Sequence, residues 1–142
     1  MADSEPEPRR GGAHLFVYGS LVDPRRLDEV LGYRFDGERL SAHLADYQRV
    51  SLEGFEWPFI VPSQGRTVVG VLVMDLTAHE LDILDRYEEV QLGFYSRASV
   101  DVEAWGCGPR PVSVAAQAYV AGPSLPRLIE SSAAHTTRST TA

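Results

Sequence analysis

Two short segments of the chain contain groups suited to chemistry, and the first is a turn. It reads Tyr18-Gly19-Ser20-Leu21 and lies between an apolar run that ends at Val17 and a helix start at Asp23-Pro24. A turn between a strand and a helix exposes backbone N–H groups, which can hold a carboxylate or a developing oxyanion. The sequence does not assign which of these two groups the turn would hold. The alternative is that Gly19 merely permits a tight bend.

The second segment is the end of a helix expected over 78–87. The helical period places Glu88 on the same face as Leu81 and Leu84. The other acids of the segment fall on the neighbouring polar side: Asp82, Asp85 and Glu89. Because an inward carboxylate is costly without partners or a water-filled cavity, Glu88 is the best candidate for chemistry. The alternatives are that Glu88 swings outward in the last turn or pairs with Arg97.

Three further side chains could complete a site. Tyr95 and Arg97 share one face of an alternating strand, and Tyr119 interrupts an apolar strand. Each tyrosine could be a wall residue with a polar tip, although such residues more often belong to the core or its rim. Ser20 is a weak candidate nucleophile because no histidine is placed as its base. The single cysteine, Cys107, lies in a turn-like setting without a neighbouring histidine.

Composition limits the classes of protein to which the chain can belong. Its 142 residues, 44% hydrophobic, suit one compact domain. With 20 acidic against 13 basic residues and no basic run, nucleic-acid binding has little electrostatic support. No apolar stretch is long enough to cross a membrane and the N-terminus is polar, which favours a cytoplasmic protein. The four scattered histidines lack metal-ligand spacing, so we expect no metal.

The elements that must position these residues are mostly short strands. Turn residues and periodicity predict helices over 23–31 and 78–87, and strands over 13–18, 39–50, 58–61, 67–76, 95–103 and 112–120. Asp23 and Thr77 are the expected N-caps, and Thr77 with Glu80 has the form of a capping box. Two prolines, Pro58 and Pro62, indicate an edge strand or the lip of a cavity between them. The ends, 1–12 and 131–142, have the composition of disordered segments.

The motifs together resemble the γ-glutamyl cyclotransferase-like family, which includes γ-glutamylamine cyclotransferases and plant avirulence-induced proteins. The segment 18–21 is similar to the family's Tyr-Gly-Ser/Thr-Leu loop, 84–88 to its Leu-Asp-x-Tyr/Phe-Glu signature, and 95–97 to the Tyr-x-Arg that follows. The order and approximate spacing also agree. The resemblance covers a domain over about 13–122. It departs from the family at Glu89, where a glycine is frequent, and this leaves the choice of substrate open.

The resemblance implies a fold and a reaction. The fold is α+β, a small mixed β-barrel flanked by a few helices. In its cavity Glu88 would act as the acid and base. The backbone of Gly19, Ser20 and Leu21 would hold the glutamyl group, and Tyr18 would shape the cavity. Tyr95, Arg97 and Tyr119 are the further substrate-binding candidates.

The implied reaction needs no cofactor. The free α-amine of a γ-glutamyl compound attacks its own γ-carbonyl, which gives 5-oxoproline and releases an amine. The alternative is a non-catalytic module of the same fold that holds a small acidic ligand. The leaving amine would contact the loops around 55–57 and 91–94, and the sequence identifies neither that amine nor the oligomeric state.

Overall fold

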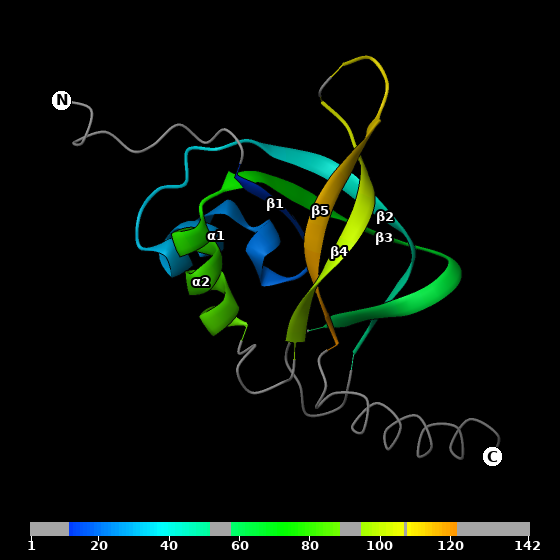
Figure 1. The fold of residues 1–142 in the computed structure, drawn as a ribbon, viewed down its shortest axis with the longest axis horizontal. Coiled ribbons are helices and arrows are strands. Elements are labelled where there is room, and N and C mark those ends of the chain that lie inside the picture. The colour runs from blue at the N-terminus through cyan, green and yellow to red at the C-terminus, as the bar shows by residue number, and fades with distance from the viewer. Residues whose placement is uncertain (1–11, 52–57, 89–94, 107, 122–142) are drawn as a thin grey trace.

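The computed structural model describes residues 12–51, 58–88, 95–106 and 108–121 (Figure 1). In this part of the chain five strands and two α-helices follow one another. The strands are β1 (Ala13–Val17), β2 (Arg39–Val50), β3 (Phe59–Leu76), β4 (Tyr95–Ala104) and β5 (Val112–Ala121). The helices are α1 (Pro24–Leu31) and α2 (Ala78–Tyr87), and a 3₁₀ turn, η2 (Ser20–Val22), precedes α1.

The sheet closes on itself in the order β1-β3-β2-β4-β5. Neighbouring strands are antiparallel except at the closing pair, where β1 runs parallel to β5 through Leu15 opposite Gln117 and Phe16 opposite Ala118. Both helices lie side by side against one side of this ring (Figure 1). The predicted α+β class with a mixed, closed sheet and flanking helices is confirmed.

Alternation along β1 divides the core in two. Leu15 and Val17 pack in a cluster with residues of α1 and α2. Phe16 and Tyr18 pack in a second cluster, in which all the other residues belong to strands. Successive side chains of a strand point to opposite faces, so β1 contributes to both clusters. The inward residues of β2 alternate too: Ala42 and Leu44 are buried in the second cluster. The residues that follow β1 therefore start from a backbone fixed on both faces.

Capping fixes the ends of both helices where the sequence predicts them. The Asp23 carboxylate accepts the backbone N–H of Arg25 at the start of α1, and Gly32 ends that helix with a φ of 87°. Thr77 and Glu80 form the reciprocal capping box at the start of α2. The helix α2 then ends at Tyr87, so Glu88 is its C-cap residue.

One prediction about the strands is wrong. The separate strands expected over 58–61 and 67–76 form a single long strand, β3, because β2 pairs with it on both sides of a register shift between Ala45 and Tyr47. Pro62 is accommodated opposite Tyr47, in the half of β3 that pairs with β2 but not with β1. Proline lacks an N–H, and one unpaired edge tolerates it there.

Gly70 allows β1 to approach β3 closely. A Cβ atom built on Gly70 would lie 2.2 Å from the carbonyl oxygen of Val17 and 2.8 Å from the Phe16 ring. These distances are far below van der Waals contact, so any larger residue would push the end of β1 away. The absence of a side chain at Gly70 thus lets the end of β1, which leads into the turn over 18–21, lie close to β3.

Candidate active site

A small pocket opens where the end of β1, the end of α2 and the start of β4 meet. Its volume is about 20 Å³, room for about one water molecule. The described residues that line it are Phe16, Val17, Tyr18, Gly19, Ser20, Leu21, Pro58, Glu88, Tyr95 and Tyr119. The two predicted segments, far apart in the sequence, therefore share one cavity.

The turn over 18–21 leads into the pocket wall as a tight 3₁₀ turn. Its first helical hydrogen bonds run from Val22 N–H to Gly19 O at 3.1 Å and from Asp23 N–H to Ser20 O at 3.2 Å. The N–H groups of Ser20 and Leu21 precede those bonds, so η2 itself does not use them. Leu21 is buried and anchors the turn in the core. The backbone donors of the turn thus lie in the wall of the pocket.

Two buried tyrosines keep neutral hydroxyls in the site. The Tyr18 hydroxyl donates to the carbonyl oxygen of Tyr119 at 2.6 Å, and the Tyr119 hydroxyl donates to Asp85 Oδ1 at 2.7 Å. Burial is the main cause that raises the pKa of both hydroxyls far above the ordinary value. The Asp85 contact raises the pKa of Tyr119 further, and the charge of Glu88 raises the pKa of both. Both groups remain hydrogen-bond donors.

Tyr95 completes this wall from the start of β4. Its hydroxyl donates to the carbonyl oxygen of Pro58 at 2.9 Å, which holds the residue before β3 against the pocket. Tyr95 also packs against the ring of Phe59, with 5.8 Å between ring centroids. The expectation that Pro58 and Pro62 bracket a cavity lip agrees with the position of Pro58 in the pocket wall.

Glu88 lies in the pocket at the end of α2, and its backbone N–H donates to Leu84 O at 2.9 Å. The side chain is half-buried. Leu81 and Leu84 on the same face are buried, as the helical period predicts. Glu88 therefore lines the same pocket as the residues of the turn.

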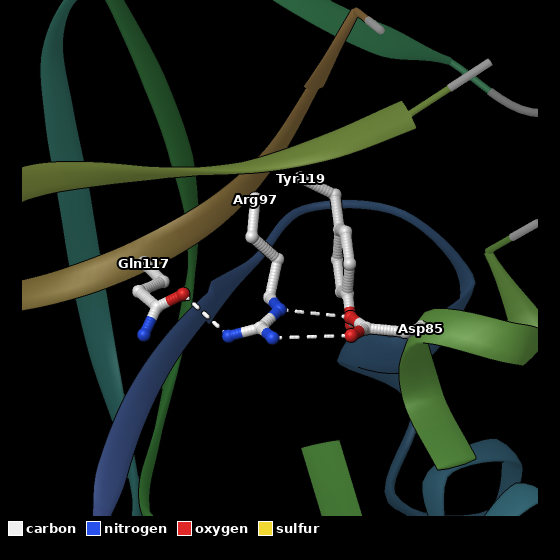
Figure 2. A network of polar contacts seen from close by, with 4 residues as sticks. All are labelled: Asp85, Arg97, Gln117 and Tyr119. Atoms are coloured by element: carbon white, nitrogen blue, oxygen red, sulfur yellow. Dashed lines mark hydrogen bonds and ion pairs between the residues drawn. The ribbon is translucent and has the colours of Figure 1, made fainter. Parts of the chain in front are cut away.

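The prediction that Asp85 belongs to the polar side of α2 is wrong. Asp85 is 22% exposed and accepts the Tyr119 hydroxyl and the guanidinium of Arg97, with 2.8 Å from Arg97 Nε to Oδ1 and 3.1 Å from Nη2 to Oδ2. Figure 2 shows these contacts. Periodicity missed Asp85 because a helix side bordering the apolar stripe also reaches the neighbouring strands. The available signal was its place in the Leu-Asp-x-Tyr/Phe-Glu signature.

Arg97 is the predicted site residue that does not line the pocket. Arg97 shares a face of β4 with Tyr95, as expected, but it lies two residues further along the strand, outside the pocket lining. There its guanidinium donates to Asp85, and its Nη1 donates to Gln117 Oε1 at 2.6 Å. The alternative in which Arg97 pairs with Glu88 is replaced by the pair with Asp85. Arg97 thus supports the site from outside the pocket.

Tyr87 is a second residue that the sequence reasoning missed. Its hydroxyl lies 2.8 Å from Ser20 Oγ, either atom being able to donate, and accepts a longer bond of 3.4 Å from Arg26 Nη1. Ser20 therefore contacts a tyrosine and no histidine, which leaves it without a base among the described residues. The contact ties η2 directly to the last turn of α2.

Several other expectations can be placed only in part. The loops around 55–57 and 91–94, Cys107 and the predicted disordered ends over 1–12 and 131–142 lie outside the described residues, except for Gly12. Within the described ranges no helix is long and apolar enough to span a membrane. In the same ranges no cluster of three or more His, Cys, Asp or Glu side chains is arranged to hold a metal ion.

The sequence from residue 15 to residue 136 matches a family model described as gamma-glutamyl cyclotransferase, AIG2-like. The chain belongs to this family. A curated relative, AIG2-like protein D of Arabidopsis thaliana, is 34% identical over 90 residues, which are 62% of this chain and 55% of that protein. The chain spans about half the length of the curated relatives it matches.

Solved structures share the fold of this AIG2-like chain. An Arabidopsis thaliana protein determined in solution is 32% identical, with a TM-score of 0.64 over 77% of this chain and 68% of that chain. A protein named gamma-glutamyl cyclotransferase has a TM-score of 0.63 at 20% identity, over 77% of this chain and 66% of that chain. At that identity the second likeness establishes the fold alone.

Proposed function

We propose that this AIG2-like protein is a γ-glutamyl cyclotransferase that converts a γ-glutamyl amine or amino acid to 5-oxoproline and a free amine, with Glu88 as general acid and base. The observation that carries the proposal is the pocket itself, in which the 18–21 turn and Glu88 lie together. The family membership of the chain supports the same reaction class. The proposal includes a cytoplasmic location and no cofactor.

Every atom of the substrate ends in 5-oxoproline or in the released amine. Glu88 takes a proton from the α-ammonium group, and the freed amine attacks the γ-carbonyl carbon to form the new C–N bond. The C–N bond to the leaving group then breaks as Glu88 returns a proton to its nitrogen. The second proton lost by the attacking nitrogen also ends on the leaving amine. No water is consumed.

The turn and the tyrosines supply binding and orientation. The Ser20 and Leu21 N–H groups suit either the α-carboxylate or the oxygen that becomes negative at the γ-carbon. Holding the chain curled is effective because well-oriented intramolecular attack has an effective molarity of roughly 10⁵ to 10⁸ M. Tyr18, Tyr95 and Tyr119 line the pocket, whereas Arg97 lies outside the lining and contributes through its ion pair with Asp85.

The test measures 5-oxoproline by mass spectrometry after incubation with a panel of γ-glutamyl amino acids, γ-glutamyl amines and glutathione. We expect Glu88→Gln to lower turnover of the best substrate by about 10²- to 10⁴-fold, the usual range for a lost acid–base group. Two variants remove a neighbouring carboxylate as matched controls: Asp82→Asn on the exposed side of α2, and Glu89→Gln. Both should retain turnover.

Two results would overturn the proposal in different ways. Equal turnover by wild type and Glu88→Gln would reject the role of Glu88. Thermal stabilisation by a γ-glutamyl compound or 5-oxoproline, without turnover by the wild type, would identify a non-catalytic binding module instead.

A further inference from the structure

Tyr119 connects the two halves of the pocket through hydrogen bonds at both of its ends. Its carbonyl oxygen accepts the Tyr18 hydroxyl, at the start of the turn, and its own hydroxyl donates to Asp85 on α2. Tyr18 and Tyr119 are 7% and 3% exposed, so these bonds are shielded from competing water. A continuous path of bonds therefore runs from the turn, through β5, to the helix that ends at Glu88.

The α2 end of this path is held by charge. Arg97 of β4 makes two parallel bonds to Asp85, and its third nitrogen donates to Gln117 of β5 (Figure 2). Bidentate pairs of guanidinium and carboxylate combine strength with a fixed relative orientation. Asp85 Oδ1 accepts from both Arg97 and Tyr119, so the carboxylate is oriented by two different strands. The last turn of α2 is thereby fixed against β4 and β5.

Asp85 and Glu88 are three residues apart on this turn. Residues at that spacing are neighbours on a helix surface, so movement of one is transmitted to the other. Glu88 still belongs to the turn through its N–H bond to Leu84 O. Asp85 is absent from the described pocket lining, whereas Glu88 is part of it. Asp85 is therefore placed to affect the reaction through the groups that it orients.

We infer that Asp85 is a positioning residue that holds Glu88 and Tyr119 in a fixed position relative to the 18–21 turn. The role in turnover rests on the proposed cyclotransferase function. Loss of the Asp85 contacts leaves the turn and its N–H donors in place but lets the Glu88 carboxylate move relative to them. Substrate binding is then retained while the proton transfers are misaligned.

Kinetics of three variants test this inference: Asp85→Asn, Tyr119→Phe and the double variant. We expect each single variant to lower kcat roughly 10- to 100-fold, the scale of an ångström-sized misplacement, with KM within about twofold of wild type. Because both changes weaken the contacts that hold the same side chain, the double variant should lose less kcat than the product of the two single losses. Asp82→Asn is the matched control on the exposed side of the helix and should be silent.

Two further measurements keep the inference testable. Asp85→Glu retains the charge but moves the carboxylate by one methylene, so it should fold, keep its Tm within a few degrees and still lower kcat. The exchange rate of the Glu88 amide, measured by NMR, reports the order of the last turn whether or not the protein turns over substrate. We expect about tenfold faster exchange in Asp85→Asn than in Asp82→Asn, since local opening becomes easier.

The failures are distinguishable. Absence of 5-oxoproline with the wild type defeats the proposed function, and the Glu88 exchange rate still decides whether Asp85 fixes the turn. Unchanged exchange in Asp85→Asn overturns the inference. The inference is also overturned if the kcat loss of the double variant equals the product of the two single losses. That result would mean that the Tyr119 hydroxyl acts on the substrate independently of Asp85. A raised KM at unchanged kcat would make Asp85 a binding residue.

Discussion

Tyr119→Phe tests the buried link by the way its cost depends on pH. The substitution removes only the hydroxyl that donates to Asp85 and keeps the ring, which is 3% exposed. A hydrogen bond to a charged group contributes about 1.5 to 3 kcal/mol. We therefore expect Tyr119→Phe to lower the free energy of unfolding by roughly 2 kcal/mol at pH 8.

The same difference should shrink at high pH. Burial and Asp85 raise the pKa of Tyr119 in the folded protein, whereas unfolding restores a value of about 10. A group whose pKa is raised by folding stabilises the protein below its unfolded pKa and loses that contribution as the pH rises. At pH 11 the unfolded chain has released this proton and the folded protein has kept it. The wild type then loses about 1.4 kcal/mol that the phenylalanine variant does not lose.

Urea unfolding at pH 8 and pH 11, followed by far-ultraviolet circular dichroism, measures this change without depending on tyrosine emission. The difference between wild type and Tyr119→Phe should fall from roughly 2 to roughly 0.6 kcal/mol. Phe59→Leu is the control, because it destabilises a fully buried aromatic site without removing a titrating group, and its cost should be the same at both pH values. A Tyr119→Phe cost that stays constant would refute the reasoning, because the hydroxyl would then titrate alike in both states.

Two further substitutions test the elements that position the site. Gly70→Ala places a methyl group against Val17 O, so it should lower the free energy of unfolding by about 1 to 3 kcal/mol and lower turnover by displacing the end of β1. Gly108 has open space around it, so Gly108→Ala should leave the free energy of unfolding unchanged in the same urea titration. Equal costs of the two substitutions would contradict the packing argument. Thr77→Ala should cost about 1 kcal/mol through loss of the N-cap bond to Glu80 N–H, while Thr77→Ser should restore most of it; a silent Thr77→Ala would show that packing alone fixes the start of α2.

Local chemistry made the helices predictable from the sequence. Asp23 and Gly32 act on backbone groups within four residues at the two ends of α1, and Thr77 and Glu80 do the same at the start of α2, so local hydrogen bonds define these boundaries. The period of α2 then placed Glu88 beside the buried leucines. The sequence pattern and the family motifs led to the same carboxylate, and the pocket contains it.

Long-range pairing limited the rest. The continuity of β3 depends on β2, which pairs with it on both sides of a bulge between Ala45 and Tyr47, although the sequence predicted separate strands over 58–61 and 67–76. The partner of Arg97 was unpredictable for a similar reason, since Asp85 reaches it only after α2 packs on the sheet. Periodicity sorts residues by face but does not tell which polar residue at the border of a face will meet another element.

The register that closes the sheet makes the pocket a reporter of complete folding. Only two residue pairs join β1 to β5, and Tyr119 follows directly after the second of them. All three sequence motifs occur before β5 begins, yet without β5 the Tyr18 hydroxyl lacks the Tyr119 carbonyl that accepts it, and Asp85 lacks the Tyr119 hydroxyl. A ligand that binds this pocket would therefore bind the closed ring in preference to any partly folded chain. Its stabilising effect would report closure of the ring.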